Sequence, residues 1–187
     1  MVTTMAAAPP TFDAERIRTL LKRAGELAVA RNSALDLLLL GGAAIALLFE
    51  SRRTTRDIDV LEVRPSRELL SEISTQIAGE ENLPTRWLND DAARFARGVV
   101  AASRGQVLFD APGIRVQSVT LEQLLASKLD AMRDDVDRAD AVTVAGAMGL
   151  SLSSTELAIA PYLRTDRYER ACQELQDIWS EVEDARR

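Results

Sequence analysis

One stretch of the sequence, residues 35–63, constrains the fold more than any other, because three structural signals follow one another within it. It opens with six residues, five of them leucine, a run whose length suits one buried strand. The pair Gly41-Gly42 ends this run, and residues of helix-forming composition follow. Polar and apolar residues then alternate from Asp57, as in a strand. The pattern predicts a strand, a glycine turn, a short helix and a second strand, in that order.

The second predicted strand carries two aspartates, Asp57 and Asp59, separated by one residue. Alternate residues of a strand point to the same side, so the two carboxylates become neighbours while Ile58 and Val60 enter the core. At about 6 Å their repulsion is roughly 0.7 kcal/mol in water and about 3 kcal/mol at an effective dielectric constant near 20, so a half-buried pair requires a cation. Oxygen ligands favour Mg²⁺ or Mn²⁺. Asp57 and Asp59 are therefore the predicted metal ligands.

The glycine pair predicts a phosphate site beside this metal. Gly41 and Gly42 follow a buried strand and open a helix, so backbone N–H groups can approach a phosphate with no Cβ in the way. The positive end of the helix dipole favours the same anion. Together the two elements predict a metal-bridged nucleoside triphosphate, held between a glycine turn and an aspartate pair.

The composition excludes several other kinds of site. The chain has no histidine and a single cysteine, Cys172, which rules out a Ser/His/Asp triad, a Cys/His pair, a zinc site and an internal disulfide. We expect Cys172 to be a buried structural thiol. The net charge of −6 argues against a surface that coats nucleic acid generally, although arginines cluster at residues 52–67 and 94–104. Neither a secretory signal nor an apolar run long enough for a bilayer is found, so we expect a cytoplasmic protein without membrane contact.

Hydrophobic periodicity and capping residues predict the remaining elements. In the first half of the chain they are a helix capped by Thr11 or Asp13 and running to about Arg31, and a helix opened by Pro65 and Ser66 and ended by Gly79. A loop then carries Trp87 into the core, followed by a short helix capped near Asn89 or Asp90 and by hairpin strands at residues 106–110 and 114–118. The rest is a helix capped by Thr120, a helix at residues 137–148 ended by Gly149, and a helical remainder. The predicted fold is α+β, a small mixed β-sheet flanked by helices with a helical C-terminal part. We expect a disordered tail at residues 1–10, a core at residues 11–119 and the helical part at residues 120–187.

Three blocks of sequence carry a resemblance to a known family. They are "LLLLGGAAIALLFESRRTTRDIDV", "RWLNDDAARF" and "LEQLLASKLDAMRDDVDRADAVTV", within residues 37–148. In this order they resemble the minimal nucleotidyltransferases of the polymerase-β-like fold, and more closely the AbiEii/MenT-like toxins of bacterial toxin–antitoxin pairs. The resemblance implies an Mg²⁺-dependent transfer of a nucleotide from an NTP to an acceptor hydroxyl, by this likeness a tRNA 3′ end, and a cognate antitoxin protein as a partner.

The resemblance also implies roles for individual residues. Asp57 and Asp59 become the catalytic metal ligands, and Lys128 a catalytic cation that faces the triphosphate. The implied nucleotide-binding residues are Gly41, Gly42, Arg53, Thr55, Asp137 and Asp140. In the toxins a hydroxyl at the place of Thr55 can be phosphorylated, which blocks the site with negative charge. The third carboxylate of the superfamily has no counterpart on the strand at residues 114–118, which leaves Asp110, Asp137 or Asp140 as substitutes.

Each of these residues also has a simpler explanation. Lys128 lies beside an apolar helical stripe and could be an ordinary lysine with its stem on the core. Asp137 could cap a helix, and Thr55 could bond to backbone groups in its loop. For the whole chain, two alternatives stay open: a catalytically silent module of the same fold that binds a partner or acts as an antitoxin, and a nucleotidyltransferase acting on a protein or small molecule.

Overall fold

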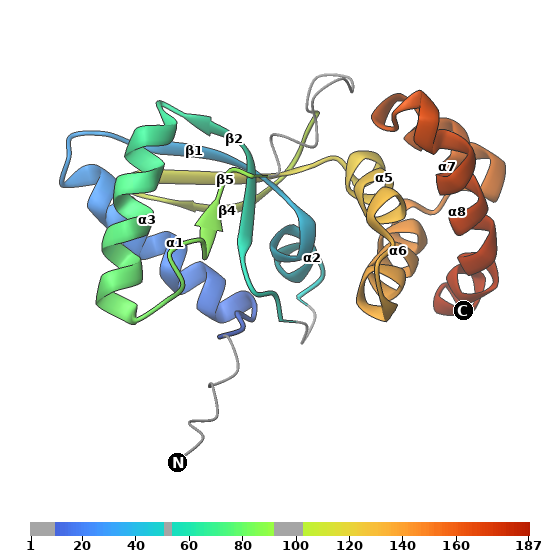
Figure 1. The fold of residues 1–187 in the computed structure, drawn as a ribbon, viewed down its shortest axis with the longest axis horizontal. Helices are drawn as coiled ribbons and strands as arrows, with labels where there is room; N and C mark the ends of the chain where they lie inside the picture. Colours follow the sequence, from blue (N-terminus) through green and yellow to red (C-terminus); the bar gives the residue numbers. More distant parts are fainter. Residues whose placement is uncertain (1–9, 51–53, 92–102) are drawn as a thin grey trace, which may run out of the picture.

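The structure, a computed structural model, describes residues 10–50, 54–91 and 103–187. These residues form an α+β protein with a five-strand mixed sheet flanked by helices and a helical C-terminal region (Figure 1). The strands are β1 (Leu35–Leu40), β2 (Ile58–Arg64), β3 (Leu88–Asn89), β4 (Arg104–Ala111) and β5 (Ile114–Val119). The helices are α1 (Ala14–Val29), α2 (Gly41–Phe49), α3 (Arg67–Glu81), α5 (Leu121–Ala131), α6 (Asp135–Met148), α7 (Leu152–Ile159) and α8 (Thr165–Ala185), with a 3-10 turn, η1 (Ala160–Tyr162).

The sheet brings the ends of separate strands to one edge. Its strand order is β3-β2-β1-β5-β4, with β1 antiparallel to β2 and parallel to β5. Strand β3 runs parallel to β2, and β4 runs antiparallel to β5. Residue Leu40, the last of β1, pairs with Asp59 near the start of β2. The end of β1, the start of β2 and the start of α2 therefore meet at this edge.

An aliphatic core fills the space between the sheet and its helices, as the composition predicts. Helices α1 and α3 pack against each other and against the sheet. Leucines 37, 38 and 39 of β1 are fully buried, which confirms the buried strand predicted at residues 35–40. The ring of Trp87 is fully buried too, so its loop carries it into the core as expected.

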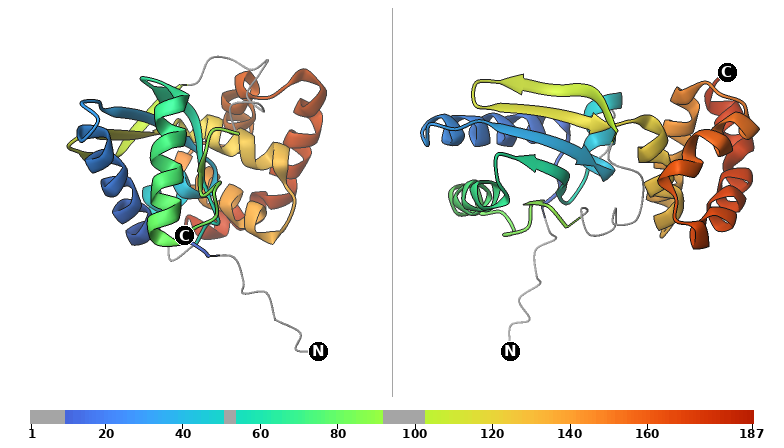
Figure 2. Two further views of the ribbon diagram at one scale, coloured as in Figure 1. Left: turned by 60° about the vertical axis from the view of Figure 1, so that its left-hand side comes forward. Right: turned by 90° about the horizontal axis from the view of Figure 1, so that it is seen from above.

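The C-terminal helices form a packed group at one end of the sheet (Figures 1 and 2). Helix α5 packs against α6 and α8, and α6 packs against α8. Helix α2 contacts both α5 and α6, so it joins this group to the sheet. Among the described residues, no single helix is long and apolar enough to cross a membrane; α6 and the α7–η1 segment meet that criterion only as a pair bent by 105°.

Most predicted elements are confirmed, with different bounds. Asp13, Ser66 and Thr120 cap α1, α3 and α5 with their side chains, and Gly149 ends α6 in the left-handed region. Helix α1 ends at Val29 and not near Arg31, α3 continues past Gly79 to Glu81, and the two hairpin strands are longer than predicted.

Three local predictions are wrong. Helix α2 begins at Gly41 itself, so the glycines are its first turn and no separate turn precedes it. Asp57 precedes β2 and lies outside the strand. Cys172 is only half-buried, since its face of α8 is partly open to solvent.

Asn89 belongs to β3, and its side-chain oxygen accepts a hydrogen bond from Asp91 N at 3.0 Å. The short helix expected after Asn89 or Asp90 lies outside the described residues, as do residues 1–9 of the tail expected at residues 1–10.

Candidate functional site

The glycine pair lies directly against the acidic residue of β2. Gly41 has a φ of 74°, in the left-handed region where glycine carries no steric cost. A Cβ built on Gly41 would stand 3.0 Å from Asp59 Oδ2. Leu40, the N-cap residue of α2, makes no side-chain hydrogen bond to the helix start. The first N–H groups of α2, beside Asp59, therefore carry no side-chain cap. Uncapped N–H groups at a helix start are able to bind an anion.

The two aspartates act on each other electrostatically. Burial, and next the charge of Asp57, raise the pKa of Asp59 to about 6, well above its ordinary 3.8. A hydrogen bond with Asn89 and the charges of Lys128 and Arg133 oppose this rise without cancelling it. The pair predicted from the D-x-D spacing is thus close enough to repel, even though Asp57 precedes the strand. A positive charge added beside the pair would therefore stabilise the ionised carboxylates in the folded protein.

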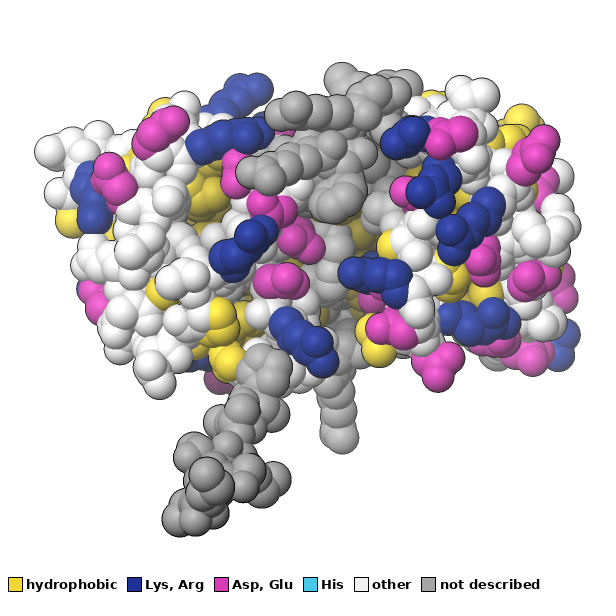
Figure 3. Space-filling view, in the orientation of Figure 1, with side chains coloured by type: hydrophobic (Ala, Val, Ile, Leu, Met, Phe, Trp, Pro, Cys, Tyr) yellow, Lys and Arg dark blue, Asp and Glu magenta, His cyan; other side chains and the backbone are white. Residues whose placement is uncertain are grey.

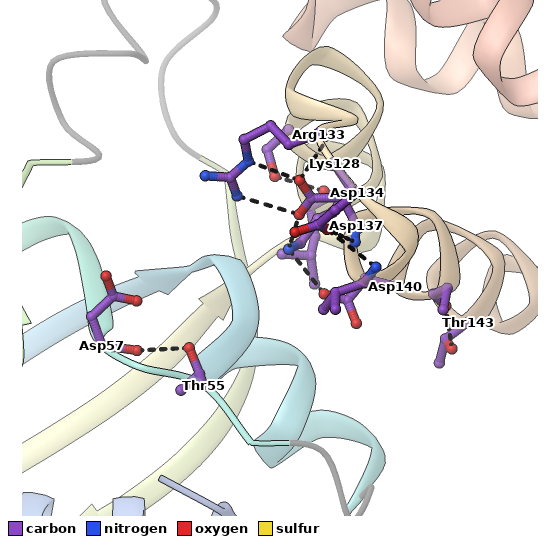
Figure 4. Close-up of polar contacts among 12 residues, drawn as sticks. Thr55, Asp57, Lys128, Arg133, Asp134, Asp137, Asp140 and Thr143 are labelled. Atoms are coloured by element: carbon purple, nitrogen blue, oxygen red, sulfur yellow. Dashed lines mark hydrogen bonds and ion pairs between the residues drawn. The ribbon is translucent and has the colours of Figure 1, made fainter. Parts of the chain in front are cut away.

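Thr55 holds the loop that leads into this pair. Its hydroxyl donates a hydrogen bond of 3.1 Å to the main-chain oxygen of Asp57 (Figure 4). A Cβ on Gly42 would stand 2.9 Å from that hydroxyl oxygen, so the second glycine makes room for Thr55. Of the two predicted roles of Thr55, nucleotide binding and hydrogen bonding to its own loop, this bond corresponds to the second. Arg53, the other residue taken from the same motif, lies outside the described residues.

Lys128 is buried between two carboxylates of the next helix. Its Nζ lies 2.9 Å from Asp137 Oδ1 and 2.9 Å from Asp140 Oδ2. All three side chains are less than one-tenth exposed. Burial alone would lower the pKa of Lys128, but its bonds to both carboxylates outweigh burial and raise that pKa. The ammonium is therefore a fixed charge, and the ordinary surface-lysine explanation is wrong.

Asp137 is an ion-pair partner of Lys128 and is not the N-cap of α6. The N-cap of α6 is Asp134, whose side chain accepts from the backbone N–H groups of Val136 and Asp137. Burial would raise the pKa of Asp137, but hydrogen bonds from Arg133 and Lys128 hold it well below its ordinary value. Asp137 and Asp140 are thus committed to Lys128, not free to serve as further metal ligands.

Arg133 is a site residue that the sequence analysis did not single out. It lies in the turn between α5 and α6, next to Met132, whose φ is 24°. Arg133 Nε donates to Asp137 Oδ2 at 2.9 Å, yet its side chain is 74% exposed. Its guanidinium points toward the side of the site that carries Asp57 (Figure 4), and the charges of Arg133 and Asp59 act on each other. The one sequence signal for Arg133 is its position between Lys128 and Asp137, two residues that the family resemblance implies for the site.

Asn89 is the second residue missed. It pairs in register with Asp59 across β2 and β3, and its amide bonds to the Asp59 carboxylate. The residue was expected near the start of a helix because asparagine is a frequent N-cap. Two consecutive strand residues are too short a pattern to predict from sequence.

Asp110, proposed as a third metal ligand, is at the wrong end of the sheet. It pairs with Arg115 on the hairpin, near the pair of Ile114 with Leu35, the first residue of β1. Asp59 pairs with Leu40 at the other end of β1. Arg115 pairs with Asp36, four residues of strand before Leu40, so the two carboxylates lie roughly 13 Å apart along the sheet, too far for ligands of one ion. Among the described residues, no group of three or more His, Cys, Asp or Glu side chains could hold a metal ion.

Arg104 of β4 pairs with two carboxylates of the neighbouring strands β1 and β2. Arg104 Nη1 lies 3.0 Å from Asp36 Oδ1, and its Nη2 lies 3.3 Å from Glu62 Oε2. Acidic and basic side chains are interspersed across the face seen in Figure 3, without a large area of one sign.

Comparisons with models of protein families, with curated proteins and with solved structures find no match to this chain.

Proposed function

We propose that this protein is a nucleotidyltransferase of the polymerase-β-like fold, which transfers NMP from an NTP to an acceptor hydroxyl with the help of Mg²⁺ or Mn²⁺. One observation carries the proposal: Asp59, with Asp57 beside it, lies against the uncapped start of α2, and the charges of Lys128 and Arg133 act on Asp59 from the C-terminal helices. The proposed metal ligands, the proposed phosphate-binding helix start and the two cationic side chains thus all lie around Asp59.

The donor atoms fit the proposed ion. Asp57 and Asp59 are oxygen ligands, and Mg²⁺ is commonly held by one or two carboxylates, with water and substrate phosphates completing its shell. Burial and the charge of Asp57 raise the pKa of Asp59, because the nearby cations compensate only part of the negative charge of the pair. When bound there, the ion would lower the pKa of the acceptor hydroxyl and neutralise charge on the leaving pyrophosphate.

The chain's own residues would bind and orient the nucleotide. The N–H groups at the start of α2 would hold phosphate oxygens, and Arg133 would add charge where the triphosphate lies. Lys128 keeps its partners and would act through the local field and by holding the α5–α6 turn. In the reaction the acceptor oxygen bonds to the α-phosphorus, the bond from that phosphorus to the bridging oxygen breaks, and pyrophosphate leaves; the hydroxyl proton passes to solvent.

The biological setting rests on the family resemblance alone. It favours an RNA acceptor, specifically a tRNA 3′ end, and a role as the toxin of a toxin–antitoxin pair in the cytoplasm. By the same resemblance the cognate antitoxin is the expected protein partner, and Thr55 the residue whose phosphorylation would block the site.

The test incubates the purified protein with each α-labelled NTP, Mg²⁺ and total RNA. We expect label in RNA of tRNA size from one or more of the four NTPs. Asp57→Ala should abolish labelling while circular dichroism shows an unchanged melting curve, because the half-buried side chain precedes β2 and fills no core position. Retained labelling in Asp57→Ala with normal melting would overturn the assignment of the site.

The alternative of a silent binding module is favoured by one observation, namely that the described residues provide no third carboxylate near the pair. Such a module would label no product with any NTP. The same experiment recognises the other alternative, since a protein or small-molecule acceptor would give labelled product of a different size.

A further inference from the structure

The first described residues of the chain are bonded to the loop that carries Asp57. Phe12 N donates to Thr55 O at 2.7 Å, and Thr55 N donates to Phe12 O at 2.9 Å. The two residues form an isolated antiparallel bridge outside the named strands. A segment 43 positions earlier in the sequence therefore pairs with the residue two positions before Asp57.

The ring of Phe12 anchors this bridge. It is only 1% exposed, and its ring packs edge-on against Trp87, with centroids 6.4 Å apart. Trp87 also holds the other side of the loop, because its main-chain oxygen accepts from Ile58 N at 2.7 Å. Phe12 and Trp87 thus restrain the backbone on both sides of Asp57.

Asp57 itself receives little direct support from the sheet. It precedes β2, and its main-chain oxygen accepts a hydrogen bond from the Thr55 hydroxyl. The direction of its carboxylate therefore depends on how firmly Thr55 and Ile58 are held. Of these two restraints, the one on Thr55 comes from Phe12.

We propose that Phe12 is a positioning residue of the candidate site: through its bridge to Thr55 it fixes the loop that presents Asp57 beside Asp59. The contact between Phe12 and Thr55 is seen in the structure, whereas its consequence for metal binding rests on the proposed function. The N-terminal segment around Phe12 then belongs to the site, although it contributes no reacting group.

A merely structural role for Phe12 must be separated from this one. Phe12→Ala removes the ring that buries the bridge, whereas Phe12→Leu keeps most of the apolar contact and serves as the conservative variant. Leu20→Ala is the matched control, because Leu20 is equally buried, lies in α1 and has no bond to the loop. The first readout is the amide exchange rate of Thr55 and Ile58 by NMR in metal-free protein. The second is the affinity for Mn²⁺ measured directly by electron paramagnetic resonance.

In Phe12→Ala we expect exchange of the Thr55 amide to accelerate about tenfold or more and Mn²⁺ affinity to fall by about tenfold, the effect of losing one such contact. Phe12→Leu should recover both, and Leu20→Ala should change neither at temperatures where it stays folded. Equal acceleration in Leu20→Ala and Phe12→Ala would overturn the positioning role, as would faster exchange with unchanged Mn²⁺ affinity. If the unaltered protein binds no Mn²⁺, the proposed metal site is wrong, while the exchange rates still decide whether Phe12 holds the loop.

Discussion

The carboxylate of Asp59 lies against the bare α-carbon of Gly41, with Oδ2 at 3.0 Å from the position that a Cβ would take. A buried strand, a helix start and the acidic strand can approach so closely only because position 41 has no side chain. The glycine pair thus determines where the aspartate pair lies, in addition to any phosphate that it binds.

Gly41→Ala should move Asp59 and weaken metal binding. The new Cβ must take a left-handed φ of 74° and press on the carboxylate, so we expect a loss of about 1–2 kcal/mol in the free energy of unfolding and a clear loss of Mn²⁺ affinity. Gly149→Ala is the matched control, because Gly149 has a φ of 67° with no atom within 4 Å of its Cβ position. Urea unfolding and Mn²⁺ titration measure the two quantities. A loss of Mn²⁺ affinity in both variants would contradict the steric argument.

Asp59→Asn should stabilise the metal-free protein, increasingly as the pH rises. The folded-state pKa of Asp59 is raised to about 6, so the folded protein binds its proton more tightly than the unfolded chain does. Stability from this group is complete below about pH 4 and is lost as the pH rises through 6. At pH 7.5 the ionised carboxylate costs roughly 1–3 kcal/mol, which asparagine avoids. The check is the difference in unfolding free energy between variant and parent, measured with EDTA from pH 4.5 to 7.5; a difference that does not change with pH would refute the argument.

The sequence predicts the local elements of this protein well, because their signals are local. The run ending at Leu40, the cap at Thr120 and the glycine at 149 each act within one or two turns of chain, and each is confirmed. The D-x-D spacing likewise predicts that Asp57 and Asp59 are neighbours. The resemblance places Lys128, Asp137 and Asp140 in one site, and the structure brings these three together.

The parts that could not be predicted depend on contacts between distant segments. Asn89 meets Asp59 only through the pairing of β2 with β3, and Phe12 meets Thr55 only through the packing of the N-terminal segment. The register of the hairpin, which places Asp110 far from the pair, depends on how β5 pairs with β1. No periodicity or cap in a single segment carries such information.

Lys128→Met should destabilise the protein strongly and in a pH-dependent way. It leaves two buried carboxylates without their shared cation, and breaking a buried ion pair in this manner costs about 3–5 kcal/mol. The deficit should shrink as the pH falls from 7.5 to 5, because the stranded carboxylates can then take up protons. The only other lysine, Lys22, is exposed, so Lys22→Met serves as the control and should change stability by less than about 0.5 kcal/mol. Thermal unfolding at the two pH values measures the effect, and equal stability of the two variants would contradict it.

Arg133→Ala should weaken nucleotide binding with little loss of stability. The guanidinium is 74% exposed, so its ion pair with Asp137 contributes about 1 kcal/mol or less, while Lys128 still neutralises that carboxylate. Its charge nevertheless reaches Asp59, where the triphosphate would lie, so we expect the Kd for Mg²⁺–NTP to rise about tenfold.

Two further variants decide whether this effect is local. Arg138→Ala removes the same charge from α6, but Arg138 pairs with Glu181 on α8, so NTP affinity should stay within about twofold of the parent. Arg133→Lys keeps the charge but loses the planar contact with Asp137, and should recover part of the affinity. Isothermal titration with a non-hydrolysable NTP at two salt concentrations provides the measurement. If Arg138→Ala weakens binding as much as Arg133→Ala, the net charge of the C-terminal helices, and not a directed contact from the α5–α6 turn, attracts the nucleotide.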